Sequence, residues 1–187
     1  PAGAAGLDAL NFARAELAQA SGAFADASAR YQRSFETRRA QLGPDHPDTL
    51  RAQFGMAIAL NFMGRTSDAR VLYTEVGERT RRVFGPRSEA LAVVFAGMAT
   101  ADRRLGHYAE AESGYREALS IHEEIGGEAG SAKAADQWAN LSRTRQDLGD
   151  LAAAEELNQR AMAIRMRLFG ADSPWVALSW QNLADYR

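Results

Sequence analysis

The stretch Gly43-Pro44-Asp45-His46-Pro47-Asp48-Thr49 determines how the rest of the chain is interpreted. Gly170-Ala171-Asp172-Ser173-Pro174 is its clearest second copy, and Gly85-Pro86-Arg87-Ser88 is a more divergent third. Glycine commonly ends a helix, and proline is suited to the first turn of the next one. The motif therefore predicts a turn between two helices. Its Asp45-His46 pair is not interpreted as a metal or catalytic site, because the second copy has Asp172-Ser173 instead.

Glycines that are expected to end helices recur in two interleaved series. Within each series the spacings are 42, 42 and 43 residues, and the two series are 21 residues apart. The first series is Gly22, Gly64, Gly106 and Gly149, and the second is Gly43, Gly85, Gly127 and Gly170. The period predicts four consecutive pairs of helices, followed by one further helix.

Small and aromatic side chains follow the same register. Alanine lies five residues after every glycine of the first series, and tyrosine lies nine residues after three of them, with Asn158 in the fourth place. These residues are Ala27, Ala69, Ala111 and Ala154, and Tyr31, Tyr73 and Tyr115. Small residues permit close approach of helices, so a tight crossing is expected within each pair.

Composition limits the classes of protein that fit the chain. The 187 residues are 46% hydrophobic and 25% charged, which predicts a single folded, soluble domain over residues 1–187. A net charge of -2 gives no basic field for nucleic acid, and no apolar run approaches the length of about 20 residues that spans a membrane. The absence of cysteine fits a reducing compartment, so we expect a cytoplasmic location.

The ends of the sequence predict that it is a fragment of a longer protein. It starts without methionine, and residues 181–187 lack a helix-ending glycine. The expected repeats cover residues 7–43, 44–85, 86–127 and 128–170, with an incomplete repeat over 171–187. The last helix is expected to lack the second helix that should cover it, which predicts self-association through this C-terminal helix.

The helix pair of 42 residues, the small residues at its crossing and the turn motif together resemble the tetratricopeptide family, in the longer variant of kinesin light chains. Gly106-His107-Tyr108-Ala109-Glu110-Ala111-Glu112 and Trp180-Gln181-Asn182-Leu183-Ala184 are the closest matches to phrases of that variant. The resemblance implies an all-α fold, a right-handed α-solenoid of antiparallel helix pairs with about four repeats and one extra helix. It also implies that the first helices line a concave face, which binds a segment of a protein or peptide.

The family pattern implies which residues face that groove. Asn140 and Asn182 occupy the place where family members often use asparagine to hydrogen-bond the backbone of a bound peptide. Gly55 and Gly97 replace it in two repeats, where they serve either helix packing or close approach of a ligand. The residues expected to bind a partner are Arg51, Phe54, Asn61, Thr100, Arg103, Arg104, Asn140, Arg143, Gln146, Gln181 and Asn182.

Two groups among these residues have alternative interpretations. Arg103, Arg104 and Arg143 are suited to clamp a carboxylate or an acidic partner. Alternatively, they form a solvated face whose charge is balanced by acidic side chains, namely Asp102, Asp136 and Asp147. Phe54 belongs to an apolar stripe with Ile58 and Phe62, which is more typical of a core than of a binding site.

The sequence contains no recognisable catalytic constellation. The three histidines, His46, His107 and His122, have no second ligand at metal-binding spacing, and the common hydrolase and phosphate-binding motifs are absent. We therefore expect a non-catalytic protein–protein interaction module without cofactor or metal. The alternative is a regulatory or sensor repeat domain of a larger bacterial signalling protein, either a kinase or a transcription regulator. RNA binding by helical repeats fits less well, because the sequence predicts no basic groove.

Overall fold

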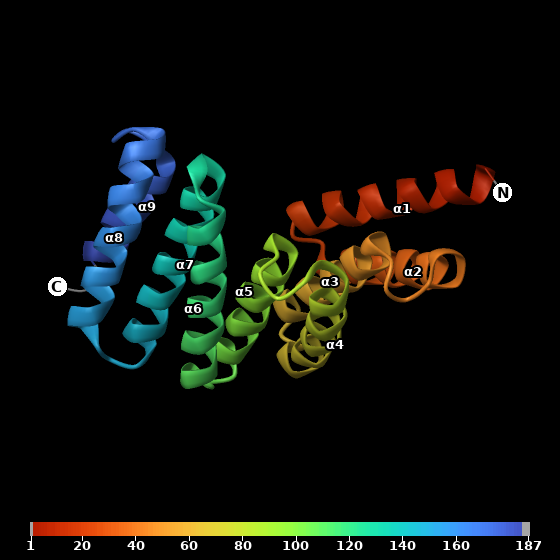
Figure 1. Cartoon of the computed structure of the whole chain (residues 1–187), viewed down its shortest axis with the longest axis horizontal. Coiled ribbons are helices and arrows are strands. Elements are labelled where there is room, and N and C mark those ends of the chain that lie inside the picture. Colours follow the sequence, from red (N-terminus) through yellow and green to blue (C-terminus); the bar gives the residue numbers. More distant parts are fainter. Residues whose placement is uncertain (1, 185–187) are drawn as a thin grey trace. The chain divides into compact units, whose positions relative to one another are not determined.

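The structure is a computed structural model that describes residues 2–184, without the side chains of residues 2–5, 129 and 184. Over this range the chain forms nine α-helices and no strand (Figure 1). The helices belong to two compact units, residues 1–86 and residues 87–187. The prediction of an all-α fold built from helix pairs is confirmed.

Unit 1 consists of two helix pairs. The first pair is α1 (Ala2–Ala20) and α2 (Phe24–Leu42), and the second is α3 (Pro47–Phe62) and α4 (Thr66–Phe84). Each helix packs against the next one in the chain, and α1 also contacts α3. Short turns reverse the chain between consecutive helices of this unit, so these neighbours are antiparallel.

Unit 2 repeats this arrangement and adds one helix. Its pairs are α5 (Glu89–Arg104) with α6 (Tyr108–Ile125), and α7 (Gly127–Asp147) with α8 (Leu151–Phe169), followed by α9 (Pro174–Ala184). Each of these helices packs against its neighbour in the chain, and α5 also contacts α7. Figure 1 shows α7 and α8 side by side with opposite directions.

The motif that starts at Gly43 forms a turn between α2 and α3, as predicted. Gly43 ends α2 with a φ of 92°, a conformation that favours glycine over other residues. The Nδ1 atom of His46 then caps α3 by accepting a hydrogen bond from the backbone N–H of Asp48 at 3.2 Å. The hydroxyl of the buried Thr49 donates back to the carbonyl of Gly43 at 2.9 Å, which closes the turn.

The turn predicted at Gly127 differs from the prediction. Gly126, and not Gly127, ends α6, and α7 begins at once with Gly127. As a result α7 has 21 residues, whereas α3 and α5 have 16 each. The other three copies contain prolines after the glycine, which keep the chain from entering a helix immediately. This copy has no proline, so the helix extends back to the glycine.

The alanine column contributes to the core of every helix pair, and the tyrosine column to the core of the first three. Ala27, Ala69, Ala111 and Ala154 are fully buried, and Tyr31, Tyr73 and Tyr115 are at most 3% exposed. In unit 1 the rings of Phe12 and Phe54 meet those of Tyr31 and Tyr73 edge to face, at centroid distances of 5.5 and 5.6 Å. Such aromatic pairs add to the stabilisation from burial alone, so the periodic positions carry the packing.

The helices cluster into two compact units. That these two units form a single domain remains a prediction. Residues 185–187 of the incomplete last repeat lie outside the described residues. Across the described residues, no helix combines the length and apolarity that crossing a membrane requires.

Candidate partner-binding face

The residues predicted to bind a partner lie on the first helices of the pairs. We call the surface that these helices form in each unit the first-helix face: α1 and α3 in unit 1, and α5, α7 and α9 in unit 2. Ion pairs join successive first helices, from Arg51 of α3 to Glu16 of α1 and from Arg103 of α5 to Asp147 of α7. Within each unit, side chains from successive helices are therefore brought together.

In unit 1, Arg51 is an exposed part of this face. Its Nη2 atom donates to Oε1 of Glu16, and its guanidinium lies 4.8 Å from the centroid of the Phe12 ring. Its side chain nevertheless keeps 61% of its accessible surface. Arg51 thus remains available to a partner while its position is defined by α1.

The other two candidates in unit 1 are less accessible. Phe54 is half-buried against Tyr73, which favours a packing role for this residue, whereas Phe62 of the same stripe is 56% exposed. Asn61 is only 3% exposed, so its side chain does not present a surface to a partner. Arg103 of α5 is the equivalent residue of the next repeat, because it precedes Gly106 by the same number of residues as Asn61 precedes Gly64. The longer side chain of Arg103 nevertheless reaches the surface. The short side chain of Asn61 explains this difference.

In unit 2 the candidates gather around the hydroxyl of Tyr115. Thr100 donates to the carbonyl of Ala96 at 2.8 Å, and its hydroxyl lies 2.9 Å from that of Tyr115. Burial raises the pKa of Tyr115 above its ordinary value, although Thr100 and nearby arginines oppose this shift. The tyrosine is therefore a neutral hydrogen-bonding group beneath the face.

Arg103 is neutralised by an ion pair. Its Nη1 atom donates to Oδ2 of Asp147 at 2.6 Å. Burial lowers the pKa of Arg103, but the hydrogen bond and the charge of Asp147 outweigh this effect and hold the pKa above its ordinary value. For Arg103 the structure agrees with the interpretation of a charge balanced by aspartate.

Arg104 and Arg143 are not balanced in this way. Arg104 is exposed, and Nη1 of Arg143 lies 3.5 Å from Oδ1 of Asn140. Neither arginine forms an ion pair with any acidic residue that the structure describes. Of the other proposed balancing acids, Asp136 pairs with Arg165 at 2.8 Å and Asp102 is buried. This part of the face therefore has excess positive charge.

The remaining candidates follow the same face to α9. Gln146 of α7 and Asn182 of α9 are partly buried, whereas Gln181 is exposed. Whether these residues bind a partner stays a prediction.

Gly55 occupies the place that Asn140 has in α7, and its role is packing. An ideal Cβ at Gly55 would lie 2.6 Å from Cε1 of Tyr31, closer than side chains approach in proteins. Only glycine therefore admits the tyrosine of the preceding pair without a shift. This contact supports the packing interpretation of Gly55 over a role in binding a ligand.

Sequence reasoning missed a column of buried polar residues on the second helices. Each lies 16 residues after a glycine of the first series, so the repeat register itself could have revealed them. They are Arg38, Thr80, His122 and Arg165, with exposed fractions of 9, 2, 1 and 5%. Arg38 donates to Asp8 at 2.7 Å and Arg165 to Asp136 at 2.8 Å. The two arginines therefore join second helices to first helices.

The third member of this column, His122, has no hydrogen-bond partner for its Nδ1 atom among the described residues. Burial holds its pKa below the ordinary value, against the opposing charge of Asp136. The described part of the chain holds no group of three or more His, Cys, Asp or Glu side chains suited to bind a metal ion.

The pattern of helix pairs agrees with a comparison against protein families. The family model for the tetratricopeptide repeat matches residues 7–76 and 134–187, more than half of the chain. The chain belongs to the tetratricopeptide repeat family. Members of this family generally mediate protein–protein interactions and are generally non-catalytic scaffolds. None of the curated proteins that were compared with the chain matches it.

Solved structures show the same fold. BtubC (BKLC) from P. vanneervenii superimposes with a TM-score of 0.77 and 24% identity, over 92% of this chain and 68% of that one. The kinesin light chain TPR-like repeats of Podosopora anserina give a TM-score of 0.77 at 19% identity, over 94% and 83% of the two chains. A point variant of the same repeats gives 0.78 at 19% identity, over 94% and 82%. At these identities the likeness concerns the fold.

Proposed function

We propose that this chain is a non-catalytic interaction module that binds a segment of a protein or peptide on its first-helix face, in the cytoplasm. The excess positive charge of Arg104 and Arg143 carries the proposal. Both arginines lie on first helices of unit 2, Arg143 with its Nη1 atom 3.5 Å from Oδ1 of Asn140, and no acidic residue in the described chain pairs with them. A partner would supply the missing acceptors.

The surrounding geometry supports the same face. Arg103 is fixed by Asp147 and Thr100 by Ala96 and Tyr115, so part of the face is rigid before a partner binds. A binding surface whose side chains are already ordered loses less conformational entropy on association. Asn140 adds an amide that both donates and accepts, which suits hydrogen bonding to an extended backbone.

The experiment that tests the proposal is a capture assay with the protein and a charge-reversed variant, Arg104→Glu/Arg143→Glu. Bound proteins are identified and quantified by mass spectrometry. We expect the variant to lose the partners that the unmodified protein captures, because two positively charged donors are replaced by carboxylates, which repel the acceptors of a partner. Arg103 is left unchanged, since its replacement by glutamate would face Asp147.

The matched control is Arg167→Glu, which reverses an exposed arginine of α8 in the same unit, away from the first-helix face. Circular dichroism of both variants establishes that the fold is intact. If the double variant and the control capture the same partners as the unmodified protein, the first-helix face is not the binding surface.

A further inference from the structure

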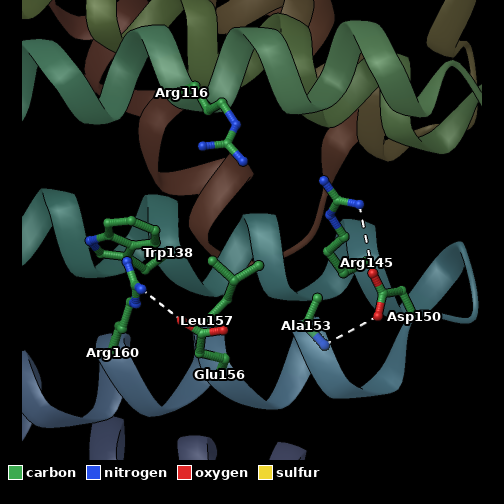
Figure 2. A pocket seen from close by; sticks show the side chains of 8 residues that line it. All are labelled: Arg116, Trp138, Arg145, Asp150, Ala153, Glu156, Leu157 and Arg160. Carbon is green, nitrogen blue, oxygen red and sulfur yellow. Dashed lines mark hydrogen bonds and ion pairs between the residues drawn. The ribbon is translucent and has the colours of Figure 1, made fainter.

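A cavity with a polar lining lies in unit 2 between α6, α7 and α8. Its volume is about 440 Å³, and each of the three helices contributes one arginine: Arg116 of α6, Arg145 of α7 and Arg160 of α8. Trp138 and Leu157 form its apolar wall. Figure 2 shows these side chains around the space between the helices. We call this site the arginine cavity.

The repeat itself does not require these arginines. Unit 1 has a cavity of about 430 Å³ at the corresponding place, beside α2, α3 and α4. There Gln32 and Leu60 stand at the positions of Arg116 and Arg145, counted from the neighbouring glycines, and both line the cavity. Since helices pack at this place without arginine at either of these two positions, Arg116 and Arg145 of unit 2 are not explained by packing alone.

Glu112 holds two of the arginines in place. It accepts hydrogen bonds from Nε and Nη2 of Arg116, at 3.1 and 2.7 Å, and both of its oxygens lie 2.7 Å from Nη2 of Arg145. Burial raises the pKa of Glu112, but these arginines outweigh it and hold the pKa below the ordinary value. The carboxylate thus stays charged, and the two guanidinium groups are oriented before any ligand binds.

Donors remain on both arginines after these contacts. A guanidinium has five N–H groups, and Nη1 of Arg116 and Nε of Arg145 have no acceptor among the residues that the structure describes. Nη1 of Arg145 lies 3.7 Å from Oδ2 of Asp150, beyond hydrogen-bonding distance. Asp150 caps α8 instead, by accepting from the N–H of Ala153. Free donors on adjacent arginines suit a carboxylate, which guanidinium groups bind with two parallel bonds.

The third arginine is held only loosely. Arg160 lies 5.0 Å from the centroid of the Trp138 ring and donates to Glu156 at 2.6 Å. The Glu156 side chain is 66% exposed, and such exposed pairs contribute little to stability. An incoming carboxylate can therefore compete with Glu156 for Arg160 at small cost.

We propose that the arginine cavity binds an acidic side chain of a polypeptide. Its carboxylate takes the remaining donors of Arg116 and Arg145, and its aliphatic part lies against Trp138. The three arginines are matched by three carboxylates, those of Glu112, Asp150 and Glu156, so the site has no excess positive charge. A carboxylate with one negative charge is therefore easier to accommodate than a phosphate with two. The cavity lies between α6, α7 and α8, and none of its lining residues is among those predicted to bind a partner on the first-helix face.

The proposal is tested with the full chain by titration of a blocked peptide that carries two glutamates, at constant ionic strength. The readout is the indole ¹H–¹⁵N resonance of Trp138, assigned by its absence in Trp138→Phe. We expect saturable shifts of this resonance. Arg145→Gln should weaken binding at least about tenfold, because a hydrogen bond to a charged group is lost. Glu156→Gln should strengthen it about two- to fivefold, because an exposed competitor is removed.

The controls separate this site from a purely structural ion-pair network. Arg167→Gln, at an exposed position of the same helix α8, should leave the affinity unchanged. Glu156 is exposed, so its variant tests the proposal even if Arg145→Gln does not fold. The proposal is overturned if a glutamine version of the peptide causes the same shifts, if inorganic phosphate binds more tightly than the peptide, or if Glu156→Gln fails to strengthen binding.

Discussion

Gly55 of α3 lies directly against the ring of Tyr31 in α2, so that a Cβ at Gly55 would be 2.6 Å from Cε1 of the tyrosine. Alanine favours helices by about 1 kcal/mol relative to glycine, yet we expect Gly55→Ala to destabilise the chain. The ring is 3% exposed and packed edge to face on Phe12, so it has little room to move. Overpacking of this kind costs about 1–3 kcal/mol, measurable as a lower free energy of unfolding in urea.

Two comparisons isolate the contact. Gly6→Ala in α1 should be neutral or slightly stabilising, because no atom lies within 4 Å of the added methyl group. In the background of Tyr31→Leu, Gly55→Ala should lose its penalty, since the ring that it meets has been removed. A cost that persists without the ring would show that the Gly55–Tyr31 contact is not its cause.

His122 makes stability depend on pH. Burial holds its pKa below the ordinary value of 6.5, so the unfolded chain takes up this proton before the folded chain does. Above about pH 6.5 both states are neutral at this position and its full contribution to stability is present. As the pH falls below 6.5, the unfolded state binds more protons, and the free energy of unfolding should decrease.

The measurement is a series of urea unfolding curves between pH 5 and pH 7.5. His122→Gln should reduce the slope of the free energy of unfolding against pH over this range, whatever its effect on stability at neutral pH. His46→Gln removes another histidine, one that caps α3, and serves as the control. An unchanged slope in His122→Gln would assign the pH dependence to other groups.

The prediction of one domain can be tested by the placement of the tryptophans. All three, Trp138, Trp175 and Trp180, lie in unit 2, whereas circular dichroism reports the helices of both units. If the chain unfolds as a single domain, the urea transitions followed by tryptophan fluorescence and by circular dichroism should coincide. A fluorescence transition that is displaced from the circular dichroism transition would show that the two units unfold separately.

Self-association through α9 remains a prediction, and Trp180 gives a way to test it. Its side chain is 56% exposed on this helix, beside the buried Ser179. Sedimentation velocity should show a larger average mass as the concentration rises, and Trp180→Ser should shift this dependence to higher concentration. Leu42→Ser, which removes an apolar side chain of similar exposure from unit 1, should not. A strict monomer at high concentration would rule out the prediction.

The helices could be predicted well because glycine and proline act locally. Gly43 and Pro47 specify the end of one helix and the start of the next through their own backbone preferences, without help from distant residues. The error at Gly127 has a local cause too. Two glycines occur together there, and the period alone does not say which of them ends α6.

The candidate face was harder to predict, because accessibility depends on the length of each side chain and on its neighbours. Arg103 and Asn61 hold equivalent positions, yet the first reaches the surface and the second does not. Pairings such as Arg145 with Glu112 join residues 33 positions apart on different helices. Their sequence spacing gives no sign of the contact, so it had to come from the structure.

The direct passage from Gly126 into α7 has a consequence for exchanging repeats between proteins of this kind. At Gly43, Gly85 and Gly170 the next helix starts four residues later, so a module cut after any of these glycines can be spliced to another in register. A module cut after Gly126 carries no linker, and the same splice would rotate the following helix about its own axis. Recombination within this chain is therefore expected to tolerate three of its four junctions.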